Sequence, residues 1–154
     1  MGPRFRIIPE MTDGVRLIVD LEIPSDLRYV GAAAGYFSRL AREHGFPEIV
    51  WAENLPLAMD EAVTNAIRHG NGESETKQVK LLARLENGEL KICVQDEGEG
   101  FDPDSLPDPR EDASIFRTSG RGVFLMRTLC DEVSFEDSGR CVNMLFRKDD
   151  IEEA

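Results

Sequence analysis

Two runs of alternating apolar residues joined by one Asn-Gly dipeptide limit the possible folds of this chain more than any other feature. The apolar positions are Val79, Leu81, Ala83 and Leu85 in the first run and Leu90, Ile92 and Val94 in the second. A period of two is typical of a strand with one buried face, and Asn87-Gly88 favours the tight turn of a β-hairpin. We therefore expect an antiparallel pair of strands here.

Further strands and helices are predicted on both sides of this hairpin. The predicted strands cover residues 15–23, 79–85, 90–94, 132–136 and 142–147, and the predicted helices cover 25–43, 47–69 and 122–130. Ser25 is expected to cap the first helix, and Pro56 either kinks the second or lies in its first turn. This order indicates an α+β fold, a two-layer α/β sandwich in which helices cover one face of a mostly antiparallel sheet.

Length and charge restrict the class of protein. The 154 residues suit a single domain, residues 1–154. No run of about 18 apolar residues or secretory signal is found, so we expect a cytoplasmic protein that does not enter a membrane. The net charge of −12 argues against nucleic-acid binding and favours a basic protein partner. The three cysteines have no metal or redox spacing and are expected to be reduced thiols.

The second predicted helix carries a polar stripe. Glu61, Asn65 and Arg68 fall on one side of it, opposite its apolar residues. One interpretation is a solvated helix face. The other is a ligand site, which the presence of an asparagine inside a helix favours, because this residue type is otherwise unfavourable there.

A carboxylate follows the second strand of the hairpin. Counting by twos places Asp96 on the same face as the buried apolar residues of that strand. A charge there must be hydrogen-bonded or stand at the mouth of a pocket. Gly98 and Gly100 follow, and such glycines allow either a close approach to a ligand or a simple tight turn.

A third feature opens the last predicted helix. Gly120 and Gly122 precede an apolar helical segment, and free N–H groups and the helix dipole favour an anion at such a place. A flexible loop that enters a core helix is the alternative. The glycine clusters fit neither a dinucleotide-binding fingerprint nor a P-loop.

In this order and spacing, the three features resemble the ATP-binding domain shared by DNA gyrase, heat-shock chaperone ATPases, sensor histidine kinases and mismatch-repair ATPases. EAVTNAIRHG (residues 61–70) resembles the asparagine box of this superfamily, DEGEGF (96–101) its first glycine box and SGRGVFLM (119–126) its second. The first motif, the length and the stretch SGRGVFLMRTLCDEV are most similar to the serine kinases that act as anti-sigma factors. The resemblance runs from about residue 25 to 148 and implies a Bergerat-type ATP-binding fold.

The resemblance also implies roles for single residues. Asn65 would hold Mg²⁺ against the phosphates of ATP, and Glu61 would be the general base. Asp96 would accept a hydrogen bond from the adenine amino group. The glycines of the two glycine boxes would shape the pocket and a lid over about residues 102–119; they are Gly98, Gly100, Gly120 and Gly122.

The implied partners are a sigma factor and a STAS-domain anti-anti-sigma protein, the second of which would be phosphorylated, and a homodimer is compatible with this interpretation. Two alternatives stay open. The chain could be a binding module that ATP switches without phosphoryl transfer, or the ATP-binding half of a split histidine kinase, although it contains only His44 and His69. A hydrolase of the gyrase type would need a transducer domain that this sequence lacks.

The sequence departs from the family at the last strand. Family members often carry a Gly-Thr pair there, whereas this chain reads GRCVNMLF, with Cys141 and Asn143 near those positions. We therefore expect the adenine side of the pocket to differ. Arg117 and Arg121 lie in the lid without an assignable phosphate contact, and His69 is interpreted as a structural residue at a helix end.

Overall fold

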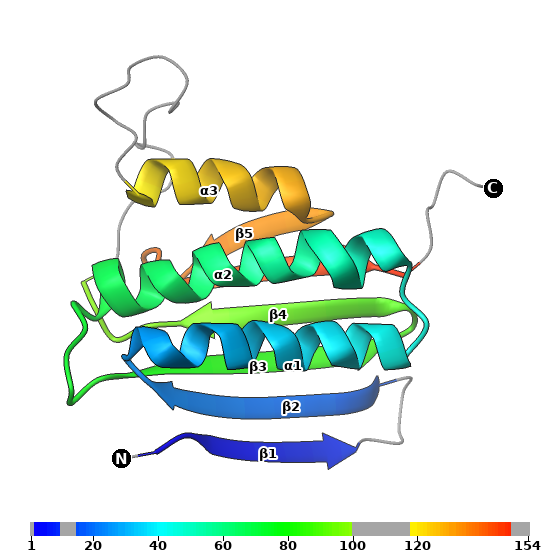
Figure 1. Cartoon of the computed structure of the whole chain (residues 1–154), viewed down its shortest axis with the longest axis horizontal. Helices are drawn as coiled ribbons and strands as arrows, with labels where there is room; N and C mark the ends of the chain where they lie inside the picture. Colours follow the sequence, from blue (N-terminus) through cyan, green and yellow to red (C-terminus); the bar gives the residue numbers. More distant parts are fainter. Residues whose placement is uncertain (1, 10–14, 100–117, 149–154) are drawn as a thin grey trace.

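The computed structural model describes residues 2–9, 15–99 and 118–148. These residues form one six-stranded sheet with helices on one face, shown in Figure 1. The strands are β1 (Arg4–Pro9), β2 (Val15–Pro24), β3 (Gln78–Glu86), β4 (Glu89–Gln95), β5 (Glu132–Glu136) and β6 (Cys141–Arg147). Their order is β1-β2-β3-β4-β6-β5 and every pairing is antiparallel. The predicted α+β sandwich is confirmed.

Three α-helices lie side by side over the sheet, with α2 in the middle (Figure 1). They are α1 (Val30–Glu43), α2 (Leu55–Asn65) and α3 (Thr118–Leu129), and shorter helical segments are η1 (Leu27–Tyr29), η2 (Ile49–Asn54) and η3 (Ala66–Gly70). The segments η2, α2 and η3 together make the long helix predicted over 47–69, with Pro56 in the first turn of α2. No helix among the described residues is long and apolar enough to cross a membrane.

The hairpin that constrains the fold forms as predicted. Glu86 pairs with Glu89, so only Asn87 and Gly88 make the turn. Both have positive φ angles, 48° and 77°, as the turn type favoured by Asn-Gly requires. The alternating apolar residues of β3 and β4 are buried against the helices, so the period of two identified the core face correctly.

Two features of the N-terminal part differ from the prediction. Strand β1 was not among the predicted strands; it pairs with β2, where Arg4 forms an ion pair with Glu22. The assignment of Ser25 as a helix cap is wrong. Asp26 caps η1 by accepting a hydrogen bond from the Arg28 N–H, because the Ser25 hydroxyl is directed elsewhere and donates to the carbonyl of Lys77.

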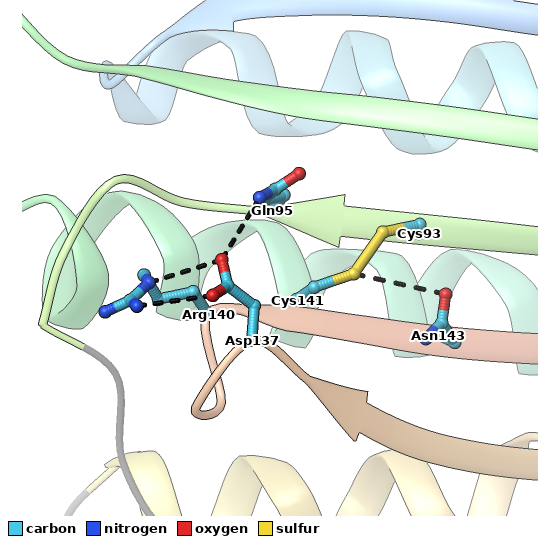
Figure 2. Close-up of a disulfide and its surroundings, with 6 residues drawn as sticks. All are labelled: Cys93, Gln95, Asp137, Arg140, Cys141 and Asn143. Atoms are coloured by element: carbon cyan, nitrogen blue, oxygen red, sulfur yellow. Dashed lines mark hydrogen bonds and ion pairs between the residues drawn. A yellow bond between two sulfur atoms is a disulfide. The ribbon is translucent and has the colours of Figure 1, made fainter.

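The cysteines also correct the sequence analysis. A disulfide joins Cys93 of β4 to Cys141 of β6, as Figure 2 shows. The two cysteines are 48 positions apart in the sequence, but the pairing of β4 with β6 brings their Cα atoms to 6.3 Å. Cys130 is a free, buried thiol, and burial raises its pKa to about 12.

Candidate functional site

A cavity of about 440 Å³ opens where the C-terminal end of the long helix meets the sheet. Four parts of the chain line it: α2 with η3, the end of β4 with the turn after it, α3, and the hairpin loop between β5 and β6. Residues central to the following description are Asn65, Gly70, Asp96, Gly98 and Arg140. The first predicted motif and Gly98 therefore meet in one place.

Glu61 and Asn65 face the start of α3. Both side chains are half-buried, and Asn65 lines the cavity. Gly122 of α3 packs directly on them: a Cβ atom there would lie 2.5 Å from Nδ2 of Asn65 and 3.0 Å from Oε2 of Glu61. Arg68, the third member of the predicted polar stripe, is exposed and is not among the described residues that line the cavity. Of the three residues in the polar stripe, Arg68 is therefore solvated, whereas Glu61 and Asn65 are partly covered by α3.

Two glycines allow the end of the long helix to touch the turn after β4. A Cβ atom on Gly70 would overlap the carboxyl group of Asp96, and one on Gly98 would overlap the carbonyl group of Gly70. Gly98 was a predicted site residue, whereas Gly70, the last residue of the first motif, was given no role in the site. The helix ends in η3, which is a π-helical segment, and such segments are frequent at functional sites.

Asp96 lies on the cavity wall, on the face that counting by twos gave it. Its Oδ1 accepts a hydrogen bond of 2.8 Å from the Gly98 N–H, and its own N–H donates to the carbonyl of Arg140. Burial raises the pKa of Asp96 above its usual value, and Asp137 adds to this. The Gly98 N–H, Arg140 and Lys77 act in the opposite direction. Asp96 therefore presents a partly buried carboxyl group to the cavity, where burial and the neighbouring donors have opposite effects on its pKa.

Asn71 supports this wall, and the sequence analysis missed it. The residue is only 3% exposed. Its amide donates to the Ser25 hydroxyl at 2.8 Å and to the Gln78 carbonyl at 3.0 Å, and accepts from the Glu97 N–H at 2.7 Å. An asparagine between two glycines reads as a turn residue, so no local signal indicated that it is buried.

The start of β6 contributes Arg140, not the two residues that were named for it. Arg140 and Val142 line the cavity. Cys141 and Asn143 alternate with the core residues Val142 and Met144 and so point to the other face of the sheet. Cys141 and Asn143 are therefore not among the described residues that line the cavity.

Several predicted positions lie beyond what the structure describes. Gly100, Arg117 and the lid residues 102–117 are outside the described residues. Gly120 and Arg121 belong to α3, but their side-chain environments are also outside the description. The helix predicted over 122–130 is present but begins earlier, at Thr118, so Gly120 and Gly122 lie within its first two turns. His69 lines the cavity.

The side-chain oxygens near the cavity suit a hard metal ion only if a bound ligand supplies further oxygen atoms to the ion. No cluster of three or more histidine, cysteine or acidic side chains that could hold a metal occurs among the described residues. Near Gly122, however, the amide of Asn65 and the carboxylate of Glu61 stand together. Mg²⁺ prefers oxygen ligands and keeps several waters, so it needs few protein donors when phosphates supply the rest. The residues fit such an ion.

Comparisons with known proteins agree with this geometry. The profile of the family described as "Histidine kinase-like ATPase domain" matches residues 23–146. The chain is 31% identical over 135 residues to a protein named serine-protein kinase RsbW from Bacillus subtilis, which covers 82% of each chain. It is 31% identical over 134 residues to RsbW of Listeria monocytogenes, covering 82% of this chain and 84% of that one. The RsbW of Oceanobacillus iheyensis is 28% identical over 125 residues, covering 77% and 78%. The chain belongs to the histidine kinase-like ATPase family and, within it, to the anti-sigma factor serine kinases.

Proposed function

We propose that this protein transfers the γ-phosphate of ATP to a serine of a STAS-domain anti-anti-sigma protein and binds a sigma factor. One observation carries the proposal: Glu61 and Asn65 stand together against Gly122, and Asn65 lines a cavity that Asp96 also lines. A base and a polar amide oxygen beside a nucleotide-sized cavity are the groups that phosphoryl transfer requires. The names of the RsbW relatives support serine as the acceptor.

Asp96 is assigned to the nucleobase. Its Oδ1 already accepts from the Gly98 N–H, so we assign Oδ2 to the amino group of adenine. A guanine carries a carbonyl at that position, which a carboxylate would repel, so GTP should bind poorly. The backbones of Gly98 and Gly100 would follow the ligand closely because they lack a Cβ atom.

The phosphates are assigned to the wall formed by α2 and α3. Free backbone N–H groups and the dipole at the start of α3, which includes Gly120, would favour their negative charge. Asn65 would hold Mg²⁺, which would neutralise charge on the phosphates when bound. Gly122 keeps this wall closely packed, because any side chain there would collide with Asn65.

Glu61 is assigned as the general base. Its carboxylate would accept the proton of the partner's serine hydroxyl as the serine oxygen forms its bond to the γ-phosphorus. The bond from that phosphorus to the bridging oxygen breaks, and ADP leaves with the electron pair. Glu61 is half-buried and lies one helical turn before Asn65, which lines the cavity, so it can face the same ligand.

The test is transfer of labelled phosphate from ATP, with Mg²⁺, to candidate STAS-domain proteins. We expect acid-stable label on a serine of the partner, and less of it with an Asp96→Asn variant when ATP is below saturation. Acid-labile label would instead indicate phosphohistidine and favour the split histidine kinase. If the wild type binds both ATP and the partner but transfers nothing, the protein is an ATP-switched binding module and the kinase assignment is wrong.

A further inference from the structure

Arg140 lies in the hairpin loop just before β6 and hydrogen-bonds to the turn that carries Asp96. Its Nη1 donates to the carbonyl oxygens of Gly98 at 3.2 Å and Glu99 at 3.1 Å. Its backbone carbonyl accepts the N–H of Asp96 at 2.9 Å. Side chain and backbone of one residue therefore hold both ends of the turn of residues 96–99, which we call the 96–99 turn.

The guanidinium group is itself held in place. Asp137 accepts from its Nε and Nη2, both at 3.3 Å, and Gln95 donates to the same carboxylate at 3.4 Å (Figure 2). Figure 2 shows Arg140 and Asp137 facing one another at the hairpin loop, beside the end of β4. A planar guanidinium with five donors can satisfy a carboxylate on one edge and carbonyls on another, whereas a lysine ammonium cannot do so in a fixed geometry.

This contact matters because the 96–99 turn sets the position of the Asp96 carboxylate. On the helix side the turn rests against Gly70 and on the Asn71 amide. On the hairpin side Arg140 is the residue whose side chain bonds to its carbonyls. Without these two hydrogen bonds, Gly98 and Glu99 could move relative to β6, and the Asp96 carboxylate would move with them.

Arg140 also contributes charge beside Asp96. The charged or titratable groups around this carboxyl group come from several elements: Arg140 and Asp137 on the hairpin loop, Lys77 before β3, His69 at the end of the long helix, and Glu97 and Glu99 on the turn itself. Arg140 and Lys77 lower the pKa of Asp96, while burial and Asp137 raise it. Removal of Arg140 would therefore also disfavour the ionised carboxylate.

We propose that Arg140 is a positioning residue that determines recognition of adenine, by fixing the 96–99 turn and so the Asp96 carboxylate. The inference rests on the proposed nucleotide site and adds to it a residue outside its three motifs. It predicts that the contribution of Arg140 to affinity depends on the amino group of adenine, because that group is the one Asp96 is assigned to read.

The test compares ATP with purine riboside triphosphate, which lacks the amino group, by calorimetry on the full chain with Mg²⁺. Arg140→Gln should weaken ATP by about 10- to 100-fold, the loss of a hydrogen bond to a charged group, and leave the analogue unchanged. Arg140→Lys should recover part of the loss. The matched control is Arg147→Gln. Arg147 lies at the other end of β6 and pairs with two carboxylates, Glu89 and Glu132, which are not among the described cavity residues.

Three results would overturn the proposal. Unchanged ATP affinity in Arg140→Gln means that the turn does not depend on this residue. An equal loss for ATP and the analogue means that Arg140 only supports the packing of the hairpin. If the wild type does not bind ATP, the proposed nucleotide site and the role of Arg140 are both wrong. The wild-type titration therefore distinguishes failure of the proposed function from failure of the role of Arg140 alone. If Arg140→Gln does not fold, as judged by circular dichroism, Arg140→Lys must show the same selective loss for ATP.

Discussion

Replacement of Asn71 by alanine should destabilise the protein strongly. The side chain is 3% exposed and makes three hydrogen bonds, to the Ser25 hydroxyl, the Gln78 carbonyl and the Glu97 N–H. A typical hydrogen bond contributes about 0.5–1.5 kcal/mol, and partners left buried without one cost more. We therefore expect the free energy of unfolding to fall by about 2–4 kcal/mol.

Urea denaturation followed by circular dichroism measures this loss. Ser74→Ala is the matched control, because the Ser74 hydroxyl bonds to Thr76 within an exposed turn. The loss of unfolding free energy for this variant should stay below about 0.5 kcal/mol. Asn71→Ala should also weaken ATP binding, since the Glu97 N–H that it releases is next to Asp96. A loss of unfolding free energy no larger than that of Ser74→Ala would refute the role given to Asn71.

Further expectations follow from single residues. Gly70→Ala should weaken ATP affinity by at least about tenfold, as calorimetry would show, because its Cβ atom would overlap the Asp96 carboxyl group. Gly35→Ala in α1 is the control, because a Cβ atom there has nothing within 4 Å. This variant should raise the melting temperature in a thermal melt. ATP affinity should fall as the pH drops through the raised pKa of Asp96, at a higher pH than for an ordinary aspartate, and in Asp96→Asn titration calorimetry should show no such fall. The same shift makes protonation of Asp96 favour the folded state, so this loss is not unfolding. Cys130, with its pKa raised to about 12, should resist iodoacetamide in native protein at mildly alkaline pH and react after denaturation, as mass spectrometry would show.

The sequence predicted those site residues whose placement depends on local periodicity. Glu61 and Asn65 share a helix face because four residues make about one turn, and Asp96 follows the alternation of β4. Each of these periods depends on the geometry of a single helix or strand, so contacts with distant segments did not alter the predicted faces. The resemblance to a family then indicated that these separate faces would meet.

The remaining site residues depend on contacts between distant segments. Asn71 bonds to Ser25 and Glu97, and Arg140 bonds to Gly98 and Glu99. Neither residue has a local pattern that distinguishes it from an ordinary turn residue. The Cys93–Cys141 disulfide was missed for the same reason, because only the pairing of β4 with β6 brings the two strands together.

The central claim, that this protein is a serine kinase with Glu61 as its base, is tested most directly by one rate comparison. Single-turnover transfer of phosphate from Mg-ATP to the cognate STAS-domain protein would be measured for wild type, Glu61→Gln and Asp60→Asn. Asp60 is the matched control, because it is an exposed acidic residue next to Glu61 on α2 and points about 100° away from it around the helix axis. Glu61→Gln should slow transfer by about 10²–10⁴-fold with ATP affinity unchanged, and Asp60→Asn should transfer at the wild-type rate. Transfer by Glu61→Gln at the wild-type rate would contradict the assignment of the base, and no transfer by the wild type would contradict the kinase itself.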